Sequence, residues 1–356
     1  MRVTVLGAGA GIARAHLHAL NAVGGQVAAV QDINPERASL AGETTGAPSF
    51  TSVEEALSVP ADLAVVLAPH PFHAPLVIAA LEAGRHVLVE KPLCDSVAEA
   101  DRMIATAARM NRLLGVAMQH RTRAEVQAAS EFIRRGGLGQ LHRLDLIGNW
   151  PRKRGYFLVA PWRGTWRGEG GGIVINQGQH DLDLLTFLAG PPARVAAWAR
   201  TRVHHIETED TAVAMLEWPS GALGSVHLST CEVDESQRLE LTGSAGRLRL
   251  THGLLEVVEN EHDFRDYVET GGNPYAAPPT RPAQRTETSP EFDHVDIYRN
   301  FLGAIAGKEP LIAPAASALH TLELANAILY ASATRADVEL PLDRAAYSNF
   351  LAARRA

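Results

Sequence analysis

The chain has 356 residues and a formal net charge of -7, with 46% hydrophobic and 21% charged residues. This length exceeds one ordinary domain and suits two, and the composition excludes intrinsic disorder. An acidic chain repels nucleic acid and anionic membranes, so neither is an expected partner. Two cysteines, Cys94 and Cys231, exclude a disulfide framework. The N-terminus lacks a signal-peptide pattern and no apolar stretch reaches about 18 residues, so we expect a cytoplasmic protein.

The first third of the chain alternates strand and helix patterns. Apolar runs predict strands over residues 3–6, 27–30, 63–68, 87–89 and 113–117, and helical spacing predicts helices over 12–22, 71–83 and 96–110. Such alternation indicates a parallel sheet with helical crossovers. Because the strands are continuously apolar, both faces of the sheet should be covered. We therefore expect a doubly wound α/β domain over residues 1–121.

The pattern changes from residue 122. A helix is predicted over 124–135, a strand over 141–149, a loop over 150–172 and a helix over 173–188. Strands follow without intervening helices over 193–202, 211–218, 222–229, 238–242 and 248–250, which indicates an antiparallel arrangement. A polar loop over 259–290 and two closing helices over 291–306 and 315–334 complete the chain.

Residues 122–356 are thus predicted to form an α+β domain with an open, mainly antiparallel sheet, whose last helices pack back on the first domain. An open sheet needs a cover, and a second copy of the same chain is the usual one. We therefore expect a homodimer or homotetramer assembled through this sheet.

A glycine-rich turn follows the first predicted strand and precedes the first helix. Glycines let the backbone approach a pyrophosphate, and the helix N-terminus offers free N–H groups. Asp32 ends the second strand, at the interval expected of an acid that binds the adenosine ribose and repels a 2′-phosphate, so NAD is favoured over NADP. The alternatives are a plain strand–helix turn and a turn-capping Asp32. The residues expected to hold the dinucleotide are Gly7, Gly9, Ala10, Gly11, Ile12 and Asp32.

Lys91 stands in the tripeptide Glu90-Lys91-Pro92, directly after the predicted strand over 87–89. The carboxyl ends of parallel strands face the ligand crevice, so Lys91 is expected to point toward the nicotinamide. Burial and a nearby cationic ring both lower the pKa of a lysine, which makes it usable in proton transfer. The alternative is a solvated surface charge. Pro92 fixes the turn, and the sequence leaves open whether its peptide bond is cis.

In a series of motifs the chain strongly resembles the Gfo/Idh/MocA family of NAD(P)-dependent sugar and cyclitol oxidoreductases. The resemblance covers nearly the whole chain and implies a Rossmann domain, a C-terminal domain with an open sheet, and dimers or tetramers. The motifs are Ala68-Pro69-His70-Pro71-Phe72-His73, the segment 80–92 ending in Glu90-Lys91-Pro92, Trp162-Arg163-Gly164-Thr165, Gly170-Gly171-Gly172, Asn176-Gln177 and His180-Asp181-Leu182-Asp183.

The family's roles carry over to individual positions. The resemblance implies that Lys91 and His180 are the catalytic residues, and that the positions of Ala68, Pro69 and His73 line the nicotinamide end of the cofactor site. The cofactor contacts expected in addition to the glycine turn are Ala68, Pro69, His73, Glu90, Lys91 and Gln119.

His180 lies on the predicted helix over 173–188, with Asn176 four residues before it and Asp183 three residues after it. A histidine titrates near neutrality, as a general acid or base should, and Asp183 is expected to orient it. The pattern alone also fits a core histidine. Inositol dehydrogenase-like members of the family carry Asp at the position of Asn176, and glucose–fructose oxidoreductase carries Tyr at that of His180. Without an Asp–His pair, proton transfer is expected to rest on Lys91 and His180.

The loop over 150–172 combines aromatic and basic residues in an acidic chain. Aromatic faces suit sugar C–H surfaces, and arginines suit hydroxyls, carboxylates or phosphates. A subunit contact is the alternative. Gln119 and Arg121 follow the predicted strand over 113–117 and are expected at the edge of the ligand crevice. The expected substrate contacts are Lys91, Gln119, Arg121, Tyr156, Trp162, Arg163, Asn176 and His180.

No metal is expected, because the pairs His204-His205 and His70-x-x-His73 lack a third ligand at a recognisable spacing. The two cysteines are interpreted as small buried apolar residues. The predicted function is reversible hydride transfer between a nicotinamide cofactor and a secondary alcohol or ketone of a sugar, sugar derivative or cyclitol. The alternatives are a non-catalytic NAD-binding regulator of the same fold, which needs no catalytic pair, and a metal hydrolase, which leaves the glycine turn unexplained.

Overall fold

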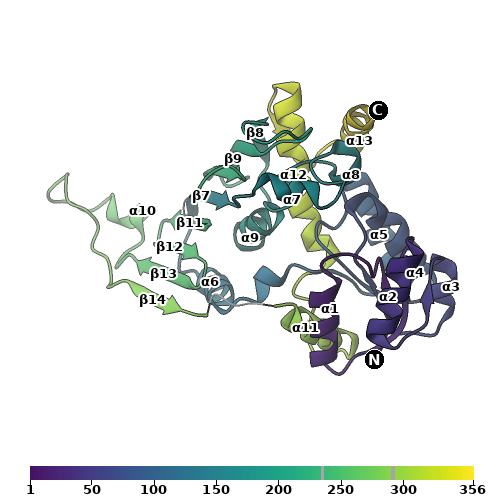
Figure 1. Cartoon of the computed structure of the whole chain (residues 1–356). Coiled ribbons are helices and arrows are strands. Elements are labelled where there is room, and N and C mark those ends of the chain that lie inside the picture. The colour runs from purple at the N-terminus through teal and green to yellow at the C-terminus, as the bar shows by residue number, and fades with distance from the viewer. Residues whose placement is uncertain (234–235, 290–292) are drawn as a thin grey trace.

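The computed structural model describes residues 1–233, 236–289 and 293–356, which form two sheets side by side (Figure 1). The first sheet has six parallel strands in the order β3-β2-β1-β4-β5-β6. This is the doubly wound order of dinucleotide-binding folds, in which ligands bind at the carboxyl ends of the strands. The strands are β1 (Arg2–Leu6), β2 (Gln26–Gln31), β3 (Ser49–Phe50), β4 (Leu63–Val66), β5 (His86–Val89) and β6 (Leu114–Val116).

Both faces of the first sheet are covered, as the continuous apolar runs predict. Along β4, Ala64 and Val66 pack into one core, whereas Leu63 and Val65 pack into another on the opposite face. The period of two along a strand makes this division. The helices of this part are α1 (Ala13–Ala22), α2 (Pro35–Thr45), α3 (Val53–Ser58), α4 (His73–Glu82) and α5 (Val97–Arg109).

The second sheet has nine strands in the order β14-β13-β12-β11-β7-β10-β9-β8-β15. The pairing of β7 with β10 is parallel and the other pairings are antiparallel, so the sheet is mainly antiparallel as predicted. The strands are β7 (Leu141–Asn149), β8 (Arg194–Arg200), β9 (Thr211–Glu217), β10 (Leu223–Ser229), β11 (Gln237–Gly243), β12 (Gly246–Thr251), β13 (Leu254–Glu259), β14 (Gln284–Glu287) and β15 (Val338–Glu339).

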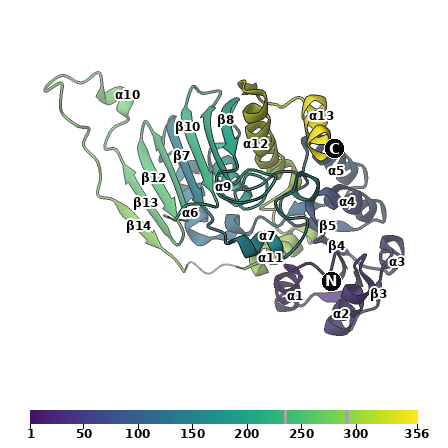
Figure 2. The same ribbon diagram turned by 45° about the horizontal axis from the view of Figure 1, so that its top comes forward.

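One face of the second sheet packs against helices, and the other lies open in Figure 2. Along β9, Ala212, Ala214 and Leu216 are buried, whereas Val213 and Met215 between them are exposed. The helices of this part are α6 (Ala124–Arg134), α7 (Arg154–Leu158), α8 (Trp166–Glu169), α9 (Gln179–Ala189), α10 (Phe264–Tyr267), α11 (Val295–Ile305), α12 (Ala315–Thr334) and α13 (Arg344–Arg355). Each helix among the described residues is too short or too polar to span a bilayer.

Helix α11 returns to the first sheet and packs beside α1. Its residues Ile297, Tyr298 and Phe301 belong to the same core as β1, and Phe301 fills the space that a side chain at Gly115 would need. The predicted start of this helix at residue 291 lies outside the described residues. The domain boundary at residue 121 stays a prediction.

The helix predicted over 173–188 is corrected: α9 begins only at Gln179, and residues 173–178 form turns. The cause lies in a distant side chain, because Glu209 Oε1 accepts from the backbone N–H groups of both Gly172 and Val174. Asn176 and His180 therefore do not share one helix face.

Several elements were not predicted, and four of them, α7, α8, α10 and β14, lie in segments that were predicted as loops. The others are α2, β3, α3, β13, β15 and a third closing helix, α13. Helices α2 and α13 begin at side-chain caps, Asn34 and Asp343, whose oxygens accept from backbone N–H groups of the first turn. Of the two free cysteines, Cys94 is buried as predicted, but Cys231 is partly exposed beyond the end of β10.

Candidate active site

The glycine turn after β1 is shaped for the close approach of a ligand. Gly7 has a φ of +78°, and a Cβ on it would lie 2.7 Å from the backbone nitrogen of Ala68. The N–H of Gly9 donates to Asp32 Oδ2 at 2.8 Å, which places the carboxylate at the end of β2 beside the turn. Any residue larger than glycine at position 7 would therefore clash with the neighbouring backbone.

The rest of the turn presents free backbone donors. A Cβ on Gly11 would meet no atom within 4 Å, and Ile12 is 38% exposed at the entrance to α1. Among the described residues, the N–H groups of Gly11 and Ile12 have no acceptor. Unpaired N–H groups at the start of a helix suit a pyrophosphate, so the turn fits the dinucleotide that the sequence predicts.

Lys91 follows β5, and its side chain reaches the segment that precedes α9. Its Nζ donates to the backbone oxygen and to the side-chain Oδ1 of Asn176, both at 3.1 Å. Burial lowers the pKa of Lys91, the carboxylates of Glu90 and Glu169 oppose this shift, and the guanidinium groups of the 150–172 loop add to it. The Lys91–Pro92 peptide bond is cis.

His180 is buried on the first turn of α9, with its ring stacked on that of His120 at 4.2 Å between centroids. Its Nδ1 is buried without a partner among the described residues. Burial, reinforced by the positive charge of Lys91, lowers the pKa of His180 to about 3. The imidazole is therefore neutral at pH 7 and can accept a proton or a hydrogen bond.

The predicted roles of Asp183 and Arg121 are wrong in this structure. Arg121 donates to Asp183 through Nε at 2.8 Å and through a second nitrogen at 2.6 Å, and both residues are about 1% exposed. The remaining nitrogen of Arg121 donates to the oxygens of Ile312 and Ser317. Asp183 therefore anchors Arg121 and not His180, and four of the five N–H groups of the buried Arg121 are engaged within the protein.

The buried side chain of His73 contacts the protein backbone on both sides of its ring. Its two ring nitrogens lie 2.8 Å from the oxygen of Pro92 and 2.7 Å from that of Ala68. Burial lowers the pKa of His73, and these two hydrogen bonds oppose the shift. The ring thus connects the turn after β4 to the turn after β5, and the contacts of His73 and Pro69 with the cofactor stay predictions.

The carboxylate of Glu90 ties three elements together. Its Oε1 lies 2.8 Å from His16 Nε2 and 3.5 Å from His294 Nε2, and its Oε2 accepts from the N–H of Lys91 at 3.0 Å. Burial raises the pKa of Glu90, but the two histidines outweigh it and hold that pKa well below its usual range. Its predicted contact with the cofactor stays a prediction, as does that of Ala10.

Within the described chain, His16, Glu90 and His294 are the three His, Cys, Asp or Glu groups whose ligand atoms lie close enough to share an ion. The histidine pairs noted in the sequence do not belong to this group. His16 Nδ1 lies 2.9 Å from the hydroxyl of Tyr298, so the cluster joins α1 and α11 to the Lys91 turn through hydrogen bonds.

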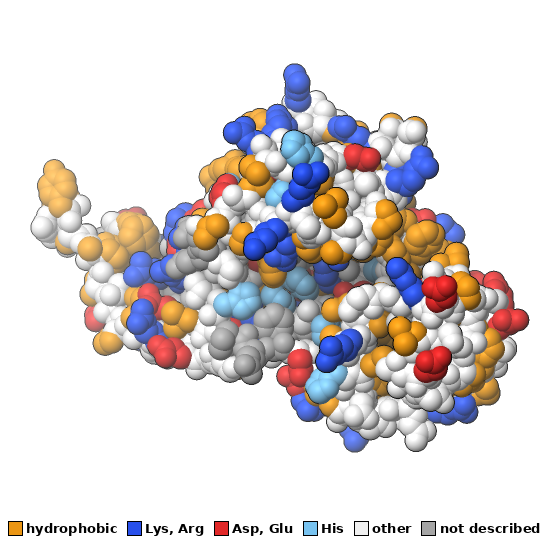
Figure 3. Space-filling view, viewed as in Figure 1, with side chains coloured by type: hydrophobic (Ala, Val, Ile, Leu, Met, Phe, Trp, Pro, Cys, Tyr) orange, Lys and Arg blue, Asp and Glu red, His pale blue; other side chains and the backbone are white. Residues whose placement is uncertain are grey.

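The 150–172 loop places aromatic and basic side chains beside this centre. The hydroxyl of Tyr156 accepts from Gln177 at 2.8 Å and from Asn176 at 3.3 Å. The guanidinium groups of Arg163 and Arg152 lie 4.1 and 5.0 Å from the centre of the Tyr156 ring. Figure 3 shows basic side chains around a hollow in which histidines gather.

Two further residues that were predicted to contact a ligand are Gln119 and Trp162. Gln119 Oε1 is buried without a partner among the described residues. The ring of Trp162 lies 5.9 Å from that of His70 and supports the guanidinium of Arg163. Both positions remain compatible with ligand binding, and their roles stay predictions.

Three buried residues of this site were missed: His120, Glu169 and Asp181. His120 stacks on His180, Glu169 accepts from Asn176, and Asp181 accepts from Trp150 Nε1 at 2.6 Å. Asp181 and Glu169 flank residues that the motifs already singled out, and two acids on a buried segment are a usable signal.

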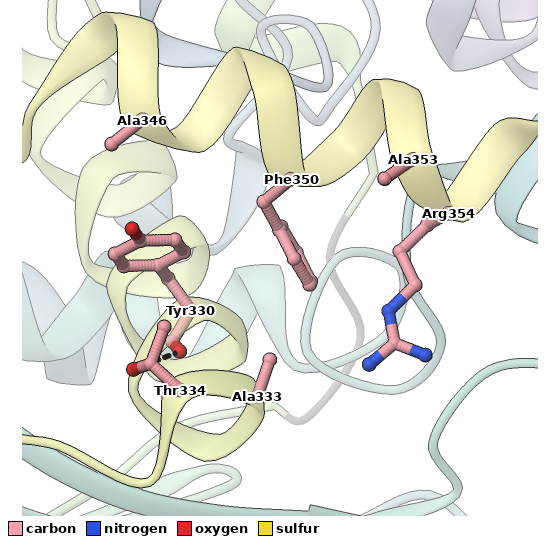
Figure 4. A pocket seen from close by; sticks show the side chains of 7 residues that line it. All are labelled: Tyr330, Ala333, Thr334, Ala346, Phe350, Ala353 and Arg354. Atoms are coloured by element: carbon pink, nitrogen blue, oxygen red, sulfur yellow. Dashed lines mark hydrogen bonds between the residues drawn. The ribbon is translucent and has the colours of Figure 1, made fainter.

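A groove between α12 and α13, seen closely in Figure 4, is lined by none of the residues above. Phe350 and Tyr330 face it, and Arg354 closes one end. Its lining is apolar apart from Tyr330, Thr334 and Arg354, and it is separate from the site of Lys91 and His180.

Comparison with known proteins identifies the family. Residues 1–118 match the oxidoreductase family with an NAD-binding Rossmann fold, and residues 126–249 match the GFO/IDH/MocA C-terminal domain. A putative UDP-kanosamine synthase oxidoreductase subunit of Amycolatopsis mediterranei is 30% identical over 252 residues, covering 64% of this chain and 69% of the relative. Myo-inositol 2-dehydrogenase of Thermotoga maritima is 28% identical, covering 70% and 74%.

Among solved structures, the WlbA dehydrogenase of Bordetella pertussis in complex with NADH and UDP-GlcNAcA superimposes with a TM-score of 0.81. It is 28% identical, and the match covers 96% of this chain and 99% of that one. The fold and the site therefore define an NAD-dependent oxidoreductase. The chain belongs to the Gfo/Idh/MocA family.

The buried Asp181 predicts a pH-dependent stability. Burial raises the pKa of Asp181 to about 7, against hydrogen bonds from Trp150 and Gln237 that lower it. The folded protein then holds this proton to higher pH than the unfolded chain. The contribution is complete below about pH 4 and is lost as pH rises through 7.

We expect the stability of the natural protein relative to Asp181→Asn to fall over that interval by up to about 1.4 kcal/mol per pH unit. Urea unfolding between pH 4.5 and 8 measures it, with the exposed Asp337→Asn as the control for loss of one carboxylate. Parallel pH profiles of the natural protein and Asp181→Asn would contradict the prediction.

Proposed function

We propose that this enzyme interconverts a secondary alcohol and a ketone on a sugar derivative, with Lys91 and His180 as the proton-transferring residues. One observation carries the proposal. The crevice holds both a lysine with a lowered pKa and a neutral histidine with an unpartnered nitrogen, and the charge of Lys91 acts on His180. A non-catalytic NAD-binding protein has no need of such a pair.

The chain's own contribution is to position the substrate and to move one proton. NAD, held by the glycine turn and Asp32, supplies the hydride acceptor or donor when it is bound. Lys91 Nζ is fixed by the two oxygens of Asn176, so its remaining hydrogen or lone pair is directed into the crevice. Neutral His180 offers a second acceptor there, and one of the two takes the hydroxyl proton during oxidation.

The substrate we propose carries a carboxylate or a phosphate. Arg152 and Arg163 flank the ring of Tyr156, and the Nε of each is buried without a partner among the described residues. Guanidinium groups on an aromatic face bind oxyanions by paired hydrogen bonds. The names of similar proteins agree, since a neighbour was solved with UDP-GlcNAcA and a relative acts in UDP-kanosamine synthesis, while others act on inositol.

We also propose a homodimer or homotetramer, formed through the open face of the second sheet. Trp198, Val213, Met215 and Leu223 expose apolar side chains on β8, β9 and β10, and β9 pairs with both of the others. Sheet faces of this kind are covered in stable proteins. A cytoplasmic location is proposed with it, supported by two cysteines that are both free.

Lys91→Ala is expected to lower kcat by about 100-fold or more, because it removes a group that transfers a proton in the transition state. Binding of NADH, followed by its fluorescence, should change little. Formation of NADH is measured with inositols, hexuronates, sugar phosphates and UDP-sugars. Lys308→Ala, at an exposed lysine, is the control. Normal turnover in Lys91→Ala would refute the assignment.

Arg163→Gln is expected to raise KM about tenfold for an anionic substrate and to leave KM for its neutral parent sugar unchanged, because a charge-assisted hydrogen bond is lost. Steady-state kinetics on matched pairs, such as a hexuronate and its hexose, test this. Arg167→Gln is the matched control in the same loop, since its guanidinium donates to a backbone oxygen of α13. Equal effects on both sugars would reject an oxyanion subsite.

Met215→Lys is expected to dissociate the oligomer, because it places a charge within the buried face of the assembly. Light scattering after size-exclusion chromatography gives the mass of the particle. Leu40→Lys, at an exposed apolar position of α2, should leave the mass unchanged. An unaltered oligomer in Met215→Lys would show that another surface makes the contact.

A further inference from the structure

Glu169 is a buried carboxylate that the reaction described above does not use. It ends α8, directly before the Gly170–Gly172 run, and is 2% exposed. Its Oε2 accepts from the N–H of Gly164 and its Oε1 from Asn176 Nδ2. Each oxygen of Glu169 thus accepts from one nitrogen donor, and one of these donors is the Nδ2 end of the Asn176 amide.

Asn176 connects this carboxylate to Lys91. The side-chain amide has a donor end and an acceptor end, and the two ends bind different partners. Its Nδ2 donates to Glu169 and to Tyr156, while its Oδ1 accepts from Lys91 Nζ at 3.1 Å. Because Glu169 accepts a hydrogen bond from Nδ2, it fixes the orientation of the amide. The Oδ1 atom is therefore the end that faces Lys91.

We propose that Glu169 is a positioning residue for the hydride-transfer reaction, acting on Lys91 through the side chain of Asn176. It holds the amide with Oδ1 toward Lys91. Its negative charge also attracts the ammonium group of Lys91 directly. This inference rests on the proposed role of Lys91, and it adds a residue that does not touch the reacting atoms.

The charges around Lys91 define what Glu169 contributes. Glu90 and Glu169 favour the protonated amine, whereas burial and the charges of Arg163 and Arg152 disfavour it. Removal of one of the two carboxylates leaves the ammonium with fewer compensating charges. The pKa of Lys91 should therefore fall, and any limb of the pH profile that reports Lys91 should move to lower pH.

The groups that face Glu169 from other elements support its ionisation. Burial raises the pKa of Glu169 above its usual range, and the N–H of Gly164, the amide of Asn176 and the charges of Arg163 and Lys91 oppose that rise without cancelling it. Glu209, on the opposite side of the glycine run, is a second buried carboxylate that feels the charge of Glu169. The backbone N–H groups of Gly172 and Val174 stabilise Glu209, so the two acids are served by separate donors.

The test compares Glu169→Gln, Glu169→Asp and the natural enzyme. In Glu169→Gln we expect kcat to fall about tenfold, NADH affinity to stay unchanged, and the Lys91 limb of the kcat profile to shift to lower pH. Glu169→Asp keeps the charge and should recover part of kcat and of the pH profile. Glu207→Gln is the control, because Glu207 is an exposed acid that holds the same loop through the N–H of Trp166.

An unchanged pH profile in Glu169→Gln, or the same kcat in the Gln and Asp variants, would overturn the proposal. Where Glu169→Gln does not fold, Asn176→Ser cuts the same connection from the other side and should show the same downward shift. A natural pH profile in Asn176→Ser would also overturn it. If the natural enzyme binds NADH but oxidises no member of the panel, the proposed function fails first, and that result is distinct from these.

Discussion

The buried ion pair between Arg121 and Asp183 sets the geometry on which the site depends. Arg121 follows the last strand of the first sheet, whereas Asp183 lies on α9 beneath the second, and their contacts of 2.6 and 2.8 Å leave little freedom between the two. Such a pair adds little net stability, but removal of one partner strands a charge at a cost of about 3–5 kcal/mol. His180 stands one turn from Asp183, so the same bonds that join the two sheets bring His180 to the crevice of Lys91.

Burial next to this ion pair changes the acid–base properties of the two proposed catalytic residues. It lowers the pKa of both Lys91 and His180, so a cation and an imidazole that would be charged or half-charged in water are shifted toward their neutral forms. Neutral forms can accept a proton from a hydroxyl group. The carboxylates of Glu90 and Glu169 oppose the shift at Lys91, so the balance of burial and charge decides the working pH of the amine.

The sequence predicts the parts of this arrangement that depend on neighbouring residues. The glycine turn, Asp32 and the Lys91 turn are local signals, and each lies at the carboxyl end of a strand of the first sheet. The caps of α2 and α13 were local signals as well, and were overlooked. The turn at 173–178 could not be predicted in this way. The backbone at its start is held by hydrogen bonds to the carboxylate of Glu209, which lies more than thirty residues away in the sequence. The pairing of Arg121 is non-local for the same reason.

The 150–172 loop combines two electrostatic roles that a residue pattern cannot separate. Its arginines lie against the face of Tyr156, whereas its acid, Glu169, lies behind Asn176, on the far side of the same hydrogen-bonded group. The Tyr156 hydroxyl and Glu169 both accept from Asn176 Nδ2, so the two halves meet at one amide. Arg152 and Arg163 are partly buried, and their charges also lower the pKa of Lys91, so a change of either arginine alters the amine as well as the oxyanion contact. The arginines and the acid of this loop act on Lys91 in opposite directions, so the contacts that select the substrate and the pKa of the amine are set together.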